Sequence, residues 1–332
     1  MGTLGEGARV AVEMCMSVRS GEHVFVLTDR PTIEVGRAIS DAAEKITKGN
    51  VKLLVLEDYV QRPAKELPKP ILDLIPWANV TYYAAESMRG ELAIRIPFIR
   101  TAVKYARHGH MPSVTKELME TGMCADYPKI SDLTKKVERI VKTCKKAKVV
   151  TNAGTELEID FHPSWRWKVS DGLYPEKGMW GNLPDGEIFT AAHRANGRMV
   201  IDELGDWFSP KYGVLSKTPV TLQVKDSRVE SSSVTCANEQ LRKEFVEYLS
   251  TDSNSNRLGE FAIGTNIFLH RLTGNLLQDE KFPSAHCAFG DPYSDETGAD
   301  WQSKTHVDCI MLKCSIWIDG KQIMDEGKHL TS

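Results

Sequence analysis

The fold is decided by RLGEFAIGTN (257–266), LLQDEKFPSAHCAFGDPY (276–293) and SKTHVDCIMLKC (303–314). Each stretch contains a short apolar run of the kind that forms β-strands, with a carboxylate or an imidazole on or beside the run. The residues that carry these groups are Glu260, His286, His306 and Asp308. Carboxylate and imidazole are the groups that proteins offer to Zn²⁺, Co²⁺ or Mn²⁺. We therefore predict a metal site built on strands.

The closest spacing of candidate ligands occurs in Thr305-His306-Val307-Asp308-Cys309. Side chains two residues apart in a strand share a face, so His306 and Asp308 point one way while Val307 and Cys309 point the other. Two ligands at this spacing can bind one ion, or one each of two adjacent ions. The pair alone would equally suit an exposed strand, and the presence of Glu260 and His286 favours ligation.

Length and composition indicate a globular chain of two domains, because it has 332 residues, 41% hydrophobic and 26% charged. The net charge of −3 gives no reason to expect a nucleic-acid or anionic-membrane partner. We expect no signal peptide, and no membrane span because no apolar run approaches the roughly 18 residues required. Seven scattered cysteines without a CxxC pair indicate a reducing compartment, so we expect a cytoplasmic protein.

The amino-terminal half alternates between strand-like and helix-like stretches. Continuous apolar runs predict buried parallel strands at 23–28, 51–56 and 80–84. Helices are expected at 4–18, 33–47, 70–75, 100–107, 114–119 and 131–148. This alternation favours an α/β fold, with a doubly wound open-sheet domain over residues 1–148. Carboxylates at strand ends, such as Asp29, Glu57 and Asp58, could bind a ligand, but no glycine-rich phosphate loop accompanies them and capping is the simpler interpretation.

From Val149 the pattern becomes mainly β. Alternating residues around Asn152-Ala153-Gly154 predict a hairpin over 149–161, and Asp319-Gly320 predicts another between 316–318 and 322–324. Further strands are expected at 166–169, 187–191, 197–202, 219–225 and 228–233. Helices are expected at 239–249 and at 266–277, where the second would carry His270. We interpret residues 149–332 as a carboxy-terminal α+β metal-binding domain.

Longer motifs surround the candidate ligands and add a further carboxylate, Glu187. They are Asn182-Leu183-Pro184-x-Gly186-Glu187-x-Phe189-Thr190-Ala191, Leu258-Gly259-Glu260-Phe261-Ala262-Ile263-Gly264-x-Asn266, Asp279-Glu280-Lys281, His286-x-Ala288-x-Gly290-x-x-Tyr293 and His306-x-Asp308. In order, spacing and flanking residues, this set resembles the M29 family of metalloaminopeptidases over roughly 149–327. The chain departs from the family in having Pro283-Ser284-Ala285 before His286 and in being shorter, which affects the shape of the pocket.

The resemblance implies a role for each of these side chains. Two neighbouring divalent ions (Zn²⁺, Co²⁺ or Mn²⁺) would be bound by Glu187, Glu260, His286, His306 and Asp308, with Tyr293 as the catalytic tyrosine. Two metals can deprotonate a water, polarise the scissile carbonyl and coordinate the α-amine, which suits an aminopeptidase that acts on short peptides. Tyr293 could donate a hydrogen bond to the oxyanion, and either Glu187 or Glu260 could transfer the proton. The resemblance also implies a homodimer.

A second kind of enzyme resembles the same family, a mononuclear iron dioxygenase that cleaves dihydroxypyridine rings. Its site needs two histidines and one carboxylate on a single Fe²⁺. The resemblance implies that this relative has a histidine at the position of Glu260. The glutamate in this chain therefore argues for the peptidase. A metal site that only stabilises an oligomer is the third interpretation, but structural zinc sites are usually rich in cysteine.

Several single residues keep a second interpretation. Glu187 follows a turn and could be exposed, and Tyr293 could cap a turn. The strand positions of Cys287 and Cys309 turn them away from the ligand face, which indicates packing. The segment Asp279-Glu280-Lys281 either lies beside the ligands, with Lys281 adding charge, or forms an exposed loop.

Overall fold

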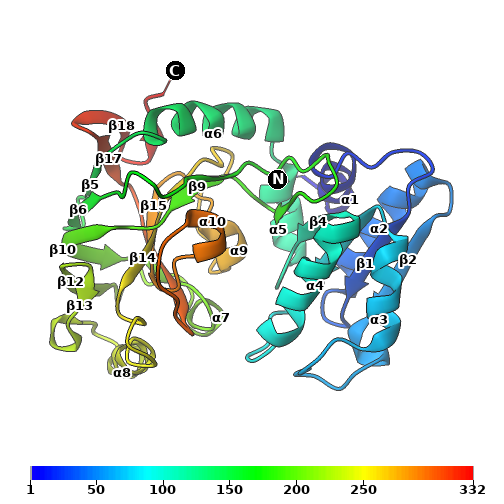
Figure 1. Cartoon of the computed structure of the whole chain (residues 1–332), viewed down its shortest axis with the longest axis horizontal. Helices are drawn as coiled ribbons and strands as arrows, with labels where there is room; N and C mark the ends of the chain where they lie inside the picture. Colours follow the sequence, from blue (N-terminus) through cyan, green and yellow to red (C-terminus); the bar gives the residue numbers. More distant parts are fainter. Residues whose placement is uncertain (1, 332) are drawn as a thin grey trace. The chain divides into compact units, whose positions relative to one another are not determined.

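A computed structural model of the chain describes residues 2–331 (Figure 1). The chain forms two compact units. Unit 1 contains the residues up to Ser131 together with Gly172–Asp185, and unit 2 contains Asp132–Asp171 and the residues from Gly186 onward. This division differs from the single boundary expected after Lys148. Most of helix α6 (Tyr127–Val141) belongs to unit 2 because its apolar side chains lie in the core of that unit.

Unit 1 is built on a five-stranded parallel sheet in the order β2-β1-β3-β4-β8. Its strands are β1 (Val24–Thr28), β2 (Val51–Val55), β3 (Val80–Ala84), β4 (Arg107–His110) and β8 (Trp180–Asn182). Strands β1 and β3 are buried along their whole length, as their continuous apolar sequences predict. The chain adds β2 on one side of β1 and β3 on the other, so the predicted doubly wound sheet is confirmed.

Short and long helices connect these strands. They are α1 (Leu4–Arg9), the π-helical η1 (Val10–Cys15), α2 (Ile33–Thr47), η2 (Leu56–Asp58), α3 (Lys69–Leu74), η3 (Ile75–Trp77), α4 (Leu92–Tyr105), α5 (Lys116–Glu120) and η4 (Gly122–Cys124). The prediction at 100–107 was wrong at both ends: the helix starts at Leu92, and Arg107 already belongs to strand β4. Asp29, suggested as a ligand or a cap, is buried, accepts hydrogen bonds from Thr32 and forms a salt bridge with Arg62.

Unit 2 contains an eight-stranded antiparallel sheet in the order β13-β12-β10-β6-β5-β17-β18-β19. The strands are β5 (Lys146–Val150), β6 (Glu156–Asp160), β10 (Arg194–Ile201), β12 (Val220–Lys225), β13 (Arg228–Val229), β17 (Ser315–Ile318), β18 (Lys321–Asp325) and β19 (Lys328–His329). Both predicted hairpins are confirmed, and at the second one Asp319 and Gly320 have φ of 47° and 85°. The predicted helix to Lys148 was wrong at its end, because Ala147 and Val149 alternate into the core as part of β5.

A second antiparallel sheet of six strands has the order β11-β16-β15-β14-β9-β7. Its strands are β7 (Lys168–Ser170), β9 (Glu187–Thr190), β11 (Glu203–Leu204), β14 (Leu258–Gly264), β15 (Ala285–Gly290) and β16 (His306–Met311). One hydrophobic core joins the two sheets, since it contains Val149 and Ile316 from the first and Phe261 and Phe289 from the second. Apolar side chains of α6 and α8 (Glu239–Tyr248) belong to the same core.

The remaining helices of unit 2 are short. They are α7 (Phe208–Tyr212), η5 (Ser231–Ser233), α9 (Leu276–Asp279) and α10 (Ser294–Thr297). The helix predicted at 266–277 was wrong, since only α9 is helical there. The main-chain N–H groups of Thr273, Gly274 and Asn275 instead donate to the carboxylate of Asp279. This hydrogen bonding holds the preceding segment as a loop around one buried side chain.

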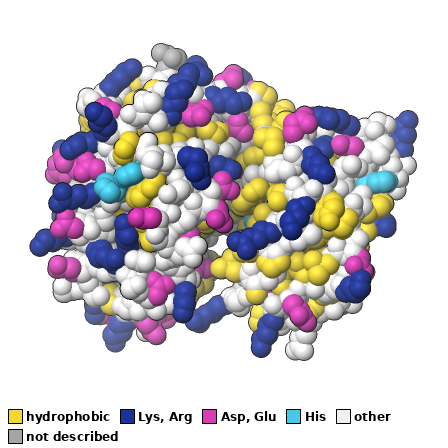
Figure 2. Space-filling view, in the orientation of Figure 1, with side chains coloured by type: hydrophobic (Ala, Val, Ile, Leu, Met, Phe, Trp, Pro, Cys, Tyr) yellow, Lys and Arg dark blue, Asp and Glu magenta, His cyan; other side chains and the backbone are white. Residues whose placement is uncertain are grey.

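Surface character differs along the chain. Figure 2 shows acidic and basic side chains interspersed on the face in view, and hydrophobic side chains gathered over α4, where Leu92 and Ile96 are exposed. Among residues 2–331, no helix combines the length and the apolar character that crossing a membrane requires.

Candidate metal centre

The sequence-predicted ligands all lie on one face of the six-stranded sheet. Adjacent strands β16, β15, β14 and β9 carry them, and residues that are Cα partners on neighbouring strands point to the same side. Asp308 is opposite Ala288, which is opposite Glu260, so both carboxylates share a face. The same register puts His306, His286 and Glu187 on that face, opposite Gly290, Ala262 and Gly264 respectively.

The other face of these strands belongs to the hydrophobic core. Cys287 and Cys309 are Cα partners and lie there together with Phe261, as the strand alternation predicted. Burial raises the pKa of both thiols well above the ordinary value, so neither is a thiolate near neutral pH. Because side chains alternate along each strand, the oxygen and nitrogen ligands lie on one face of the sheet and the sulfur atoms lie on the other.

The carboxylates and imidazoles converge in space. His286 Nε2 lies 3.4 Å from Glu260 Oε1, 3.5 Å from Glu187 Oε2 and 3.9 Å from Asp308 Oδ1. His306 Nε2 lies 3.4 Å from Asp308 Oδ1 and 3.7 Å from Glu260 Oε2. The two oxygens of Glu260 thus face different histidines. Each histidine has its own set of carboxylate neighbours, and Glu260 and Asp308 are common to both sets.

The buried polar atoms of this cluster fit a divalent cation. Glu260, His286 and Asp308 are each at most 5% exposed, and one ligand atom from each lies within 4.8 Å of the others. Glu260 Oε2 and His286 Nε2 have no hydrogen-bond partner, although a buried polar atom without one is costly. An ion bound between these atoms would satisfy them. The cluster could therefore hold a metal.

Electrostatics inside the cluster favour positive charge. Burial alone would lower the pKa of His286, but the adjacent carboxylate of Glu260 and the charges of Glu187 and Asp308 raise it to about 9. Burial would also lower the pKa of His306, but the charges of Asp308 and Glu260 outweigh this effect and raise the pKa to about 10. Burial raises the pKa of Asp308, but the charge of His306 and the other cations of the cluster lower it by more. The pKa of Asp308 therefore lies below its ordinary value. Bound cations would replace the protons that these histidines hold.

Main-chain contacts set the orientation of His306. Its Nδ1–H donates to the carbonyl oxygen of Asp291 at 2.8 Å, which leaves Nε2 for the cluster. A carbonyl partner on the second ring nitrogen is the usual arrangement for a metal-binding histidine, because it fixes the tautomer and the ring direction. The ring of His306 is therefore held in place without a metal.

Tyr293 lies beside the cluster at the start of α10. Its backbone is left-handed, with φ 51° and ψ 57°, and its ring centroid is 4.4 Å from that of His306 and 5.9 Å from that of Phe189. The residue is 44% exposed. Burial of the hydroxyl end and the charges of Glu260 and Asp308 raise its pKa well above the ordinary value. The phenol stays protonated and can donate a hydrogen bond.

The segment after α9 contacts the cluster as well, which resolves the two interpretations of Asp279-Glu280-Lys281. Lys281 is fully buried, and its Nζ lies 2.5 Å from Glu187 Oε1 and 2.6 Å from Glu280 Oε1. Glu203 is another buried acid on the ligand face, and no motif in the sequence indicates it. It stands opposite Ile310, which stands opposite His286. It lies on the two-residue strand β11, which has too few residues for a periodic signal.

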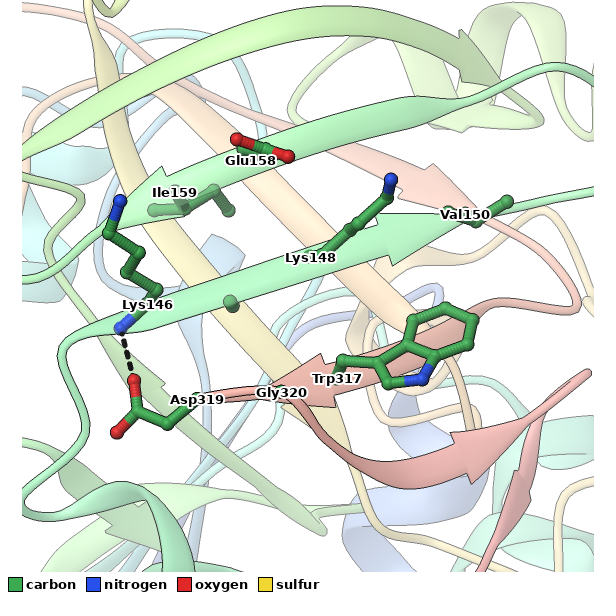
Figure 3. Close-up of a pocket in the computed structure, with 9 residues that line it drawn as sticks. Lys146, Lys148, Val150, Glu158, Ile159, Trp317, Asp319 and Gly320 are labelled. Atoms are coloured by element: carbon green, nitrogen blue, oxygen red, sulfur yellow. Dashed lines mark hydrogen bonds between the residues drawn. The ribbon is translucent and has the colours of Figure 1, made fainter.

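A separate cavity of about 560 Å³ lies on the other sheet of unit 2 and is lined by Lys146, Lys148, Glu158 and Trp317, among others (Figure 3). None of the candidate ligands lines it. Its lysines form salt bridges with acidic side chains of the adjacent strand, Lys146 with Asp160 and Lys148 with Glu156. We therefore interpret this cavity as part of a solvated sheet face.

The fold and the buried carboxylate–histidine cluster define a candidate metalloenzyme. The chain belongs to the M29 family of thermophilic metalloproteases, whose family model matches residues 118–329. Among solved structures it is similar to a 2,5-dihydroxypyridine dioxygenase from Pseudomonas putida KT2440, with 16% identity and a TM-score of 0.71 over 99% of this chain and 97% of that one. It is also similar to AmpT from Thermus thermophilus, with 15% identity and a TM-score of 0.70 over 98% of each chain. No curated protein matches the sequence.

Proposed function

We propose that this protein is a metal-dependent aminopeptidase that releases amino-terminal residues from short peptides with two divalent ions. The observation that supports it most is the position of Glu260, whose oxygens face His286 and His306 separately at 3.4 and 3.7 Å. A carboxylate between two histidines suits two neighbouring ions. Family membership supports the reaction class.

The chain's own side chains have distinct tasks in this proposal. Glu187, Glu260, His286, His306 and Asp308 would hold Zn²⁺, Co²⁺ or Mn²⁺, and paired ions of this kind supply an acidic water and polarise a carbonyl. Tyr293 would donate its phenolic hydrogen to the oxygen of the peptide carbonyl as negative charge develops there. Glu260 and Glu187, both buried at the centre, are the carboxylates that would carry a proton toward the departing amine.

A mononuclear iron dioxygenase is the second candidate, and the similarity to the dihydroxypyridine dioxygenase supports it. The group of Glu260, His286 and Asp308 could also hold a single ion. Three carboxylates around two histidines nevertheless exceed the two-histidine, one-carboxylate set that such iron sites use. This composition favours hydrolysis.

The deciding experiment uses protein that has been stripped of metal with a chelator. Aminoacyl amides and dipeptides are supplied before and after addition of Zn²⁺, Co²⁺, Mn²⁺ or Fe²⁺, and free amino acid is measured. Release that depends on added metal is the expected result. Consumption of a dihydroxypyridine with Fe²⁺ and oxygen, without peptide hydrolysis, would replace this proposal with the dioxygenase.

Variants of the cluster test the assignment of residues. Glu260→Gln and His306→Ala should lose bound metal and peptide hydrolysis while circular dichroism shows a retained fold. Glu158→Gln, an exposed glutamate on the other sheet, is the matched control and should behave as wild type. Full activity in either cluster variant would disprove the site.

A homodimer stays a proposal that rests on the family resemblance, and light scattering after gel filtration would test it. A cytoplasmic location also stays a prediction. It is supported by the seven cysteines, all of which are free thiols in the structure.

A further inference from the structure

Lys281 is a buried cation that touches one of the candidate ligands, Glu187. It is fully buried, which is rare for lysine unless its charge is paired. Its Nζ lies 2.5 Å from Glu187 Oε1 and 2.6 Å from Glu280 Oε1. A salt bridge therefore ties one of the candidate ligands to the segment that follows α9.

The main chain around Lys281 is held on both sides. Its N–H donates to Gln278 O at 2.9 Å, and its carbonyl accepts from Asn266 N–H at 3.1 Å, just after β14. Nearby, the carboxylate of Asp279 accepts the main-chain N–H groups of Thr273 and Gly274, both at 2.7 Å. The ammonium group is thus presented from a fixed position.

Glu187 and Glu260 differ in how their oxygens are used. Both oxygens of Glu260 face histidines of the cluster. In Glu187, Oε1 accepts from Lys281 while Oε2 lies 3.5 Å from His286 Nε2. Only one oxygen of Glu187 is directed at the position that His286 would help to bind.

We propose that Lys281 is a positioning residue for the metal centre, which holds Oε1 of Glu187 so that this carboxylate offers the ion beside His286 one oxygen and a reduced negative charge. An ion bound there would then keep a coordination position for substrate that a bidentate carboxylate would fill. This inference rests on the proposed function only in requiring that the cluster bind metal.

Removal of the ammonium group should strengthen metal binding. Without Lys281, both oxygens of Glu187 can approach the ion, and a positive charge near that ion is gone. Both changes strengthen metal binding, whereas loss of activity alone would not distinguish positioning from damage. Metal affinity and coordination number are therefore the informative quantities.

The experiment titrates Co²⁺ into stripped wild-type protein and Lys281→Met, with affinity from chelator competition and coordination from the visible absorption of the bound ion. Co²⁺ with six ligands absorbs far more weakly than Co²⁺ with four or five. We expect Lys281→Met to bind the more tightly held Co²⁺ about tenfold more strongly, because the repulsion between the ammonium group and the ion is gone, and to show a weaker absorption band. Lys211→Met is the control, because Lys211 also pairs with a glutamate, Glu244 at 2.6 Å, outside the cluster.

Unchanged or weaker Co²⁺ binding in Lys281→Met, or an unchanged band, overturns the inference while wild-type metal binding leaves the proposed function intact. Wild-type protein that binds no divalent ion overturns both. If Lys281→Met does not fold, the double variant Lys281→Met, Glu280→Gln removes one charge of each sign, and the same tighter binding and weaker band are expected of it.

Discussion

Glu203→Gln should remove a pH dependence of stability that the wild-type fold carries. Glu203 is fully buried and accepts a hydrogen bond from Ser209 at 2.7 Å. Burial, followed by the charge of Asp279, raises its pKa from 4.5 to about 9. In the neutral range it is thus protonated beside the carboxylate of Asp279. Glutamine has nearly the same shape, keeps an oxygen that can accept from Ser209 and does not titrate.

The magnitude follows from the number of protons bound. Between pH 6 and 8 the folded protein holds one proton on the Glu203–Asp279 pair that the unfolded chain has released, because the folded-state pKa of Glu203 is raised. The free energy of unfolding therefore falls as pH rises, by about 1.4 kcal/mol per pH unit from this proton. Between pH 6 and pH 8, the free energy of unfolding of Glu203→Gln should therefore rise by about 2.7 kcal/mol relative to that of wild type.

Urea unfolding at pH 6, 7 and 8, followed by circular dichroism with a chelator present, measures this difference. Contributions from the histidines of the cluster are common to both proteins and cancel in the comparison. Glu239→Gln is the control, since Glu239 is exposed and its pKa is lowered mainly by a hydrogen bond to Arg242, so it carries no extra proton in this range. Parallel stability–pH lines for wild type and Glu203→Gln would refute the protonated pair.

Three further results are expected. Arg62→Met leaves two fully buried carboxylates without their cation, and should lower the free energy of unfolding by about 3–5 kcal/mol; a urea midpoint near that of wild type would contradict it. Gly264→Ala places Cβ 1.9 Å from the carbonyl oxygen of Phe282, so thermal unfolding should show a loss of about 1–3 kcal/mol or more, whereas Gly5→Ala, with open space, should show none. Tyr293→Phe should lower kcat by about 10²–10³-fold with KM and bound metal unchanged, and an unaltered kcat would exclude a role for the hydroxyl in the transition state.

Strands with a strong local pattern were predictable, and strand β4 shows where prediction fails. Its sequence is Arg-His-Gly-His, yet every residue is buried. Arg95 donates to Nε2 of His110, so Nδ1–H of His110 donates to His108, and Nδ1–H of His108 donates to Thr81. These partners come from α4 and β3, and no local sequence signal indicates them. A polar strand can be buried when distant residues satisfy it.

Only part of the candidate site could be predicted from the local sequence. The two-residue spacing of His306 and Asp308 fixes their common face from local geometry alone. That Glu260 and Glu187 join them depends on the register of neighbouring strands, which the sequence does not specify and which the family resemblance supplied. The burial of Lys281 was left open because its partner Glu187 lies on β9, almost a hundred residues earlier.

The alternation of β15 and β16 has a consequence for the kind of metal this protein can bind. Cys287 and Cys309 stand directly opposite one another, one position beyond His286 and Asp308, on the reverse side of the same strands. A slip of one residue in each strand would turn the thiols to the ligand face and the histidine and carboxylate into the hydrophobic core. The ligand face would then present a pair of soft sulfur donors, which suit Cu⁺ and closed structural Zn²⁺ sites rather than open carboxylate–histidine sites. Strand register alone therefore decides whether these strands present carboxylates and imidazoles or thiols to the candidate metal site.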